Sequence, residues 1–103
     1  MQIKALNGGA LSVSVAGGKP MIITPHAIER WMERISGDTE SMCYRASVAR
    51  RIPSRELRKF KRKNFALRNI NDDHELREHG GVIFIIDPKR NVVITVIKSE
   101  YVK

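Results

Sequence analysis

The sequence lacks several features that define common classes of protein. It contains one cysteine, Cys43, among 103 residues, which excludes an internal disulfide framework and a cysteine-based zinc site. We expect this thiol to be buried or half-buried in a reducing compartment. No stretch approaches the roughly 18 consecutive apolar residues that a membrane helix needs, and residues 1–20 lack the continuous apolar run of a signal peptide. These absences predict a cytoplasmic protein with no membrane partner.

Sequence motifs of several enzyme classes are also absent. The glycine-rich stretches "NGG" and "AGG" lack the Lys-Ser/Thr pair of a phosphate-binding loop. No serine or cysteine stands in a recognisable nucleophile setting, which argues against the hydrolases that need one. His74 and His79 are five residues apart, whereas a helical metal pair is separated by four. We predict no metal and no cofactor, and we interpret both histidines as exposed loop residues; a second catalytic histidine is the alternative.

The positive charge is concentrated in one segment. The chain has 19 Lys and Arg against 11 Asp and Glu, a net charge of +8. Between Arg50 and Arg68 nine basic residues accompany one acid, Glu56, while the remaining 84 residues hold ten of each sign. A neutral body with one cationic segment indicates a polyanionic partner, most simply nucleic acid; the alternative is a solvated helix face that only aids solubility. The predicted nucleic-acid-binding residues are Arg34, Arg50, Arg51, Arg55, Arg58, Lys59, Lys61, Arg62, Lys63 and Arg68.

Length and hydrophobic periodicity predict a single domain over residues 1–103. In residues 1–23, the alternation of Leu11, Val13 and Val15 with serines predicts a half-buried strand, joined to an earlier strand by a turn at residues 7–9. Residues 81–101 contain two β-branched apolar runs separated by Asp87-Pro88-Lys89-Arg90, which predicts an antiparallel hairpin. Both runs are apolar on both faces, as central strands are.

The helices are expected in residues 24–67. Thr24 can cap the first helix, with Pro25 at its first position, and its predicted inner stripe is Ala27, Ile28, Trp31, Met32 and Ile35. Asp38 can cap a second helix over residues 39–51, and a third is predicted over 54–67, while 71–81 is expected to be a loop. The fold class is therefore α+β: an antiparallel sheet with a C-terminal β-hairpin and two to three helices packed on one side.

The first predicted helix carries an unusual row of cations. His26, Arg30 and Arg34 follow each other four residues apart, and such like-charge pairs cost a helix a few tenths of a kcal/mol each, about 0.2–0.5. Pairing of Arg30 with Glu33 recovers part of this, and an external anion such as phosphate explains the rest. His26 also lies in the first turn, where anions are favoured and an imidazole can act as a general acid or base. The alternative is that His26 merely follows a cap and the arginines are surface residues.

Two stretches of the chain carry a resemblance to a known group. "ITPHAIERWMERIS" and "GGVIFIIDPKRNVVITVIKSEY" resemble small phage- and toxin-associated domains of the barnase/EndoU/colicin/RelE-like ribonuclease superfold, over about a third of the chain. The resemblance implies metal-independent RNA cleavage on a sheet face, in which the 2′-hydroxyl attacks its neighbouring phosphate. It implies that His26 is the acid or base, that Arg30 clamps the phosphate and that Thr95 is a hydrogen-bonding partner. Apart from the resemblance, the residues themselves make Arg34, Lys98 and Tyr101 further candidates.

Two classes of function follow from these observations. One is a toxin-like endoribonuclease that acts on RNA without a metal, which would need an antitoxin-like protein inhibitor. The other is a non-catalytic phage or mobile-element protein that binds nucleic acid, RNA in preference to DNA, or inhibits a host protein that handles it. The ribonuclease requires a set of acid and base groups near a basic groove, whereas the binder requires the basic segment Arg50–Arg68 alone.

Overall fold

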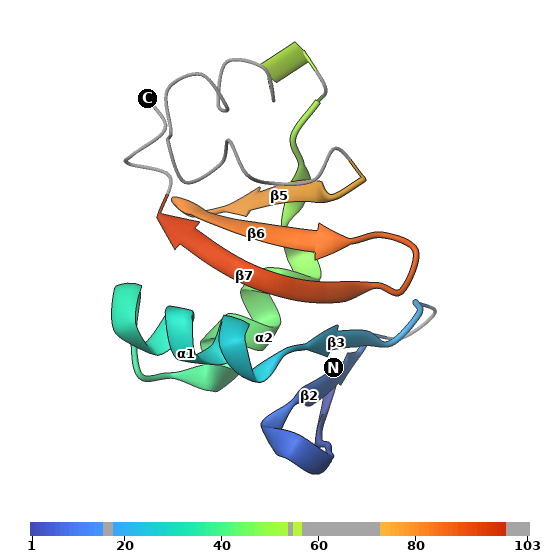
Figure 1. Cartoon of the computed structure of the whole chain (residues 1–103), viewed down its shortest axis with the longest axis vertical. Coiled ribbons are helices and arrows are strands. Elements are labelled where there is room, and N and C mark those ends of the chain that lie inside the picture. The colour runs from blue at the N-terminus through green and yellow to red at the C-terminus, as the bar shows by residue number, and fades with distance from the viewer. Residues whose placement is uncertain (16–17, 54, 57–72, 99–103) are drawn as a thin grey trace.

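The computed structural model describes residues 1–15, 18–53, 55–56 and 73–98. Within them a seven-stranded mixed sheet is packed against two α-helices (Figure 1), which confirms the α+β class. The strand order is β1-β2-β3-β7-β6-β5-β4. In chain order the elements are β1 Gln2–Ala5, a 3₁₀ turn Asn7–Gly9, β2 Leu11–Ser14, β3 Met21–Ile23, α1 Pro25–Arg34, α2 Thr39–Val48, β4 Arg50–Arg51, β5 Glu75–His79, β6 Val82–Asp87 and β7 Val92–Lys98.

The sheet differs from the fully antiparallel one that the sequence predicts. β3 and β7 are parallel neighbours, with Ile22 opposite Val92 and Ile23 opposite Val93, while the other neighbouring strands are antiparallel. Parallel neighbours need a long crossover, and here the chain between them passes through both helices and three strands. The predicted N-terminal and C-terminal hairpins, β1–β2 and β6–β7, are both confirmed.

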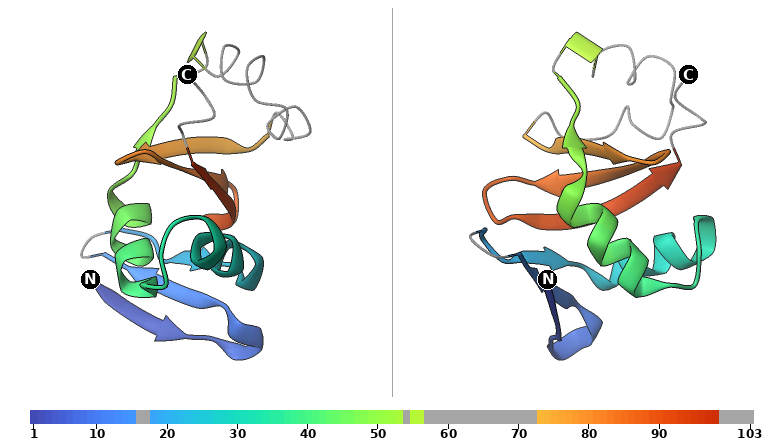
Figure 2. Two further views of the ribbon diagram at one scale, coloured as in Figure 1. Left: turned by 90° about the vertical axis from the view of Figure 1, so that its left-hand side faces the viewer. Right: turned by 180° about the vertical axis from the view of Figure 1, so that it is seen from behind.

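Both faces of the sheet centre are buried. Trp31 and Met42 of the helices pack with Phe84 and neighbouring strand residues in one cluster, and α2 crosses this face in front of the sheet when the molecule is seen from behind (Figure 2, right). A second cluster lies on the opposite face of β5, β6 and β7 and consists of Ile52, Leu76, Ile83, Ile85 and Ile97. β6 is buried along five of its six residues, so the prediction of a central strand apolar on both faces is confirmed.

The start of α1 follows the sequence signals. The Thr24 hydroxyl accepts a hydrogen bond from Ala27 N at 3.1 Å, and Pro25 occupies the first helical position. Ala27 and Trp31 are fully buried, but Met32 is 55% exposed, so its assignment to the inner stripe was wrong. Met32 follows Trp31 by one residue, and a rotation of about 100° carries it away from a stripe centred on Trp31.

Two other element predictions need correction. α2 ends at Val48, and Arg50–Arg51, predicted as its last turn, form the edge strand β4. Glu75–His79, predicted as a loop, form β5. Gly80 and Gly81 have φ of 55° and 88°, the left-handed pair that a two-residue hairpin turn requires. That Gly-Gly pair was the signal for β5, and the polar composition of the strand obscured it. The third helix predicted over 54–67 lies almost wholly outside the described residues.

Candidate functional site

α1 continues where β3 stops beside β7. β3 pairs with β7 only at Val92 and Val93 among the described residues. The Thr24 hydroxyl lies 3.0 Å from Val93 O and 3.1 Å from Ile94 O and donates to this pair of carbonyls. At the other end of α1, Arg34 Nη1 donates to Val96 O at 2.9 Å. Both ends of the helix are thus tied to β7, and α1 lies beside that strand (Figure 1).

The cation row has internal partners. Arg30 forms an ion pair and hydrogen bond with Glu33, the i,i+3 contact that the sequence predicts. Arg34, predicted to bind nucleic acid, uses one guanidinium nitrogen on Val96 O, which satisfies an edge carbonyl that β3 does not reach. His26 is exposed in the first turn. The fold itself therefore explains part of the like-charge spacing, and it leaves the imidazole at the surface beside the two arginines.

Thr95 lies on the β7 segment that α1 borders, but its side chain is on the far face. Thr95 is the cross-strand partner of Ile85, which belongs to the second cluster, and cross-strand partners share a face. An irregularity in β7 sets this arrangement: Ile85 pairs with Thr95 and Ile86 with Val93, so Ile94 is an extra residue. The structure thus brings His26, Arg30 and Arg34 into one row and directs Thr95 away from the cluster that α1 covers.

The described part of the basic segment lies at the outer edge of the sheet. Arg50, Arg51 and Arg55 are exposed; Arg51 Nε lies 3.1 Å from Glu75 Oε1, yet its side chain is still 70% exposed. A hollow of about 350 Å³ beside β4 mixes Arg50 and Arg51 with Glu56 and Glu78. The other predicted binding residues lie outside the described residues: Arg58, Lys59, Lys61, Arg62, Lys63 and Arg68.

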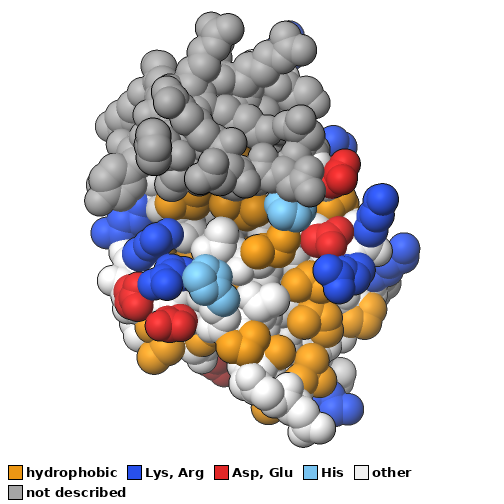
Figure 3. All heavy atoms as spheres, in the orientation of Figure 1, with side chains coloured by type: hydrophobic (Ala, Val, Ile, Leu, Met, Phe, Trp, Pro, Cys, Tyr) orange, Lys and Arg blue, Asp and Glu red, His pale blue; other side chains and the backbone are white. Residues whose placement is uncertain are grey.

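Outside the basic segment, the basic and acidic residues of the chain are equal in number. In the view of Figure 3, blue and red side chains are interspersed across the described part of the face, in agreement with the equal number of each sign outside residues 50–68. The start of the cationic segment, Arg50–Arg51, forms the edge strand β4.

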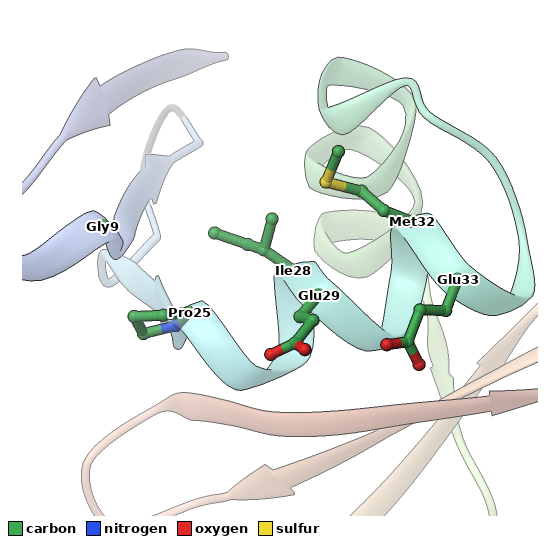
Figure 4. A pocket seen from close by; sticks show the side chains of 6 residues that line it. All are labelled: Gly9, Pro25, Ile28, Glu29, Met32 and Glu33. Atoms are coloured by element: carbon green, nitrogen blue, oxygen red, sulfur yellow. The ribbon is translucent and has the colours of Figure 1, made fainter.

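A groove on the outer side of α1 was not anticipated from the sequence. It has a volume of about 400 Å³ and is lined by Gly9, Pro25, Ile28, Glu29, Met32 and Glu33 (Figure 4). The carboxylates of Glu29 and Glu33 point to the same side of the helix in this view. Because they would repel phosphate groups, this groove does not suit a polyanion.

His79 has a structural role that its position in the sequence does not suggest. His79 Nδ1 accepts a hydrogen bond from Arg45 Nε at 3.2 Å, and Arg45 Nη2 donates to the carbonyls of His79 and Gly80, both at 2.9 Å. The same guanidinium lies 5.3 Å from the centre of the Trp31 ring. His79 ends β5, so its interpretation as a loop residue was wrong. His74 precedes β5 outside the strand, as expected of a loop residue, but it is half-buried and not exposed. Among the described residues no group of three or more His, Cys, Asp or Glu is placed to hold a metal ion.

Cys43 and Trp31 belong to the core, as the sequence predicts. Both are fully buried, and the Trp31 ring stacks on Phe84 with centroids 6.2 Å apart, so Trp31 is not a platform for a nucleic-acid base. Burial, and secondarily the Glu40 carboxylate, raise the pKa of the Cys43 thiol. A buried thiol with less thiolate is a poor nucleophile.

Comparison of the chain with protein-family models, with curated proteins and with solved structures gives no match. Among the described helices, none is long and apolar enough to cross a membrane.

Proposed function

We propose that this protein binds nucleic acid, RNA in preference to DNA, through the basic segment Arg50–Arg68. The observation that carries the proposal is the separation of charge: this segment alone accounts for the net +8, and the rest of the chain is neutral. Solubility requires no such concentration, whereas a phosphate backbone responds to it directly through release of counterions.

The described residues support a binding role for the start of this segment. Arg50, Arg51 and Arg55 are exposed, and β4 is the last strand of the sheet. Arginine in particular offers paired N–H donors that match phosphate oxygens. A surface at the sheet edge gives an extended polyanion access without displacement of the core, because the arginine heads lie outside the buried clusters.

The test is binding of labelled single-stranded RNA by fluorescence anisotropy across a salt series. We expect the logarithm of the affinity to fall linearly with the logarithm of salt concentration, with a slope of about 0.7 for each phosphate contacted. The variant R50Q/R51Q removes two of the nine cations and should weaken binding and reduce that slope by about 1.4, which is the contribution of two phosphate contacts.

The matched control is K89Q/R90Q, which removes two adjacent exposed cations from the turn between β6 and β7. It lowers the net charge by the same two units, and we expect its salt slope to equal that of the wild type within error. An equal loss of RNA affinity in both double variants would mean that the net charge of the protein, and not the basic segment, is responsible for binding. An affinity that is flat with salt would contradict the proposal outright.

A ribonuclease activity at α1 is the second candidate. It is favoured by one observation: exposed His26 stands one turn before Arg30 on the helix row that borders β7. In this reaction the imidazole would take the 2′-hydroxyl proton or protonate the leaving 5′-oxygen, and Arg30 would stabilise the charged phosphorane. For Thr95 to contact the same substrate, the RNA would have to extend around β7 to the opposite face of the sheet, because the Thr95 side chain shares a face with Ile85.

Cleavage of RNA in the presence of EDTA tests this candidate. We expect products with 2′,3′-cyclic phosphate ends and a loss of about 10²–10⁴-fold in rate for His26→Ala, with His74→Ala as the control histidine. Binding without cleavage in wild type would leave the protein as a non-catalytic binder and His26 as a surface residue.

A further inference from the structure

The exposed apolar side chains of the described residues gather at one edge of the sheet. Of the seven large hydrophobics recorded as exposed, Met1, Ile3 and Leu6 belong to or flank β1. Val15 continues β2 directly opposite Met1, as the pairing of Gln2 with Ser14 requires. The others are Tyr44 and Val48 of α2 and Met32 of α1. Six of the seven thus lie on the β1–β2 hairpin or on α2.

α2 lies next to the start of β1. Ser47 Oγ is 3.9 Å from Met1 Sδ, and the N-terminal end of the chain lies beside α2 in both views of Figure 2. All four residues of β1 are exposed. An edge strand is normally protected by charge, proline or a covering element, and β4, at the other edge, consists of two arginines. β1 has a single charged side chain, Lys4, and no element in the described part of the chain covers its apolar flank.

Among the described strands, β1 pairs with β2 alone, so one side of its backbone has no strand partner there. Leu6 N donates to Ala10 O at 2.9 Å, which makes Leu6 and Ala10 a hydrogen-bonded pair. Because such pairs alternate along an antiparallel ladder, Lys4 with Ser12 and Gln2 with Ser14 are the bonded pairs of β1 and β2. The N–H and C=O groups of Ile3 and Ala5 therefore point outward, where they can bond another strand.

We propose that β1 is a dimerisation edge at which a second copy of this chain adds its own β1, antiparallel, to continue the sheet. A two-fold axis at Ile3 places Ile3 opposite Ile3 of the second copy, Gln2 opposite Lys4, and Met1 opposite Ala5. All three pairings are free of like charges, whereas an axis at Lys4 would oppose two ammonium groups. This register uses the outward groups of Ile3 and Ala5 in full.

Charge and geometry also favour a second copy over a foreign strand. The excess positive charge of each chain lies in residues 50–68, whose described start, β4, is at the opposite end of the sheet from β1, so pairing through β1 keeps these starts apart. An axis normal to the sheet puts both helical layers on the same side. The apolar side chains of β1 and the neighbouring α2 of one copy then face those of the other, which accounts for exposed Met1 and Val48 as well as Ile3.

Sedimentation velocity of the full chain, from micromolar concentrations to about 1 mM, tests the proposal. We expect a species of twice the 11.7 kDa chain mass that dissociates on dilution. Ala5→Pro removes one outward N–H and leaves the β1–β2 bonds intact, and Ile3→Lys places charge on the apolar edge. Each should weaken dimerisation at least tenfold, while Met32→Lys, at an apolar position on α1 that is more exposed than Ile3, should leave it unchanged.

Hydrogen exchange keeps the test independent of the variants. In wild type, the Ile3 and Ala5 amides should exchange more slowly as protein concentration rises, whereas the turn amides of residues 89–91 should not. A chain that stays at 11.7 kDa throughout, or a dimer that Ile3→Lys leaves intact and Met32→Lys abolishes, would overturn the proposal. Circular dichroism of each variant identifies any that fails to fold.

Discussion

At the scale of the residue, Arg45 joins parts of the molecule that the sequence keeps far apart. Its guanidinium lies over the Trp31 ring of α1 and donates to His79 and Gly80 in the β5–β6 turn. Cation–π contact and charge-assisted hydrogen bonds are individually modest, at about 0.5–1 and 1.5–3 kcal/mol. Together they fix the position of the turn against the helices.

The space beside Gly80 shows how closely Arg45 packs against the β5–β6 turn. Gly80 has φ of 55°, and a Cβ there would lie 2.9 Å from Arg45 Nη2, whereas a Cβ at Gly8, with φ of 83°, meets open space. Left-handed backbone costs other residues about 1–2 kcal/mol. We expect Gly8→Ala to destabilise by that amount alone, and Gly80→Ala by roughly 1 kcal/mol more, because Arg45 must also move.

Urea denaturation measures both changes. In an Arg45→Ala background the extra cost of Gly80→Ala should disappear, so the double-mutant cycle should give a coupling of about 1 kcal/mol. Equal costs for the two glycine substitutions in wild type would mean that Arg45 does not restrain the turn.

At the scale of the element, α1 is positioned by side chains that bond the β7 backbone. Thr24 both caps the helix and donates to the carbonyl pair of Val93 and Ile94, and Arg34 reaches Val96 O at the other end. The helix therefore covers a stretch of strand edge that would otherwise be open. The row that contains His26 owes its position beside β7 to these contacts.

Thr24→Ala should remove the cap and the tie to β7 together. Loss of an N-cap costs about 0.5–2 kcal/mol, and the unpaired carbonyl adds roughly 1 kcal/mol more. We expect Thr24→Ala to lower the free energy of unfolding by about 2 kcal/mol, with faster hydrogen exchange in the first turn of α1. Thr24→Ser, which retains the hydroxyl, is the control and should cost less than half as much; a similar loss in both would assign the effect to packing of the methyl group.

At the scale of the whole molecule, the two proposed surfaces lie at opposite ends of the sheet. β1 is the first strand in the order and β4 is the last. Pairing through β1 would leave β4 and its arginines exposed in both copies. A dimer would then carry two cationic segments on one rigid sheet, and binding of the second segment to the same RNA would be intramolecular.

This arrangement predicts a length-dependent effect of Ile3→Lys. On an RNA of about ten nucleotides, which can meet one segment, we expect affinity per chain close to that of wild type. On an RNA several times longer, wild type should bind at least tenfold more tightly than Ile3→Lys, because the monomer loses the gain from linked sites. Anisotropy measured on both lengths checks this, and equal loss on the short RNA would place β1 in the binding surface itself.

The local elements were predictable where a backbone or packing rule has a direct sequence signature. The Thr24-Pro25 start, the Asp38 cap and the two apolar strands of the C-terminal hairpin all follow from side-chain chemistry within a few residues. The concentration of charge in Arg50–Arg68 is likewise a property of the sequence alone. β5 was missed because its side chains are mostly polar and its stability comes from its neighbour β6.

Tertiary structure alone decided which distant residues meet. Parallel pairing of β3 with β7, the contact of Arg34 with Val96 and the role of Arg45 all join positions more than ten residues apart, and no local pattern specifies them. The same holds for the face of Thr95, which depends on the extra residue Ile94. A strand has period two, so one extra residue changes the face of every side chain beyond it. The sequence determined that these residues form a strand, whereas pairing with β6 determined the face on which the Thr95 side chain lies.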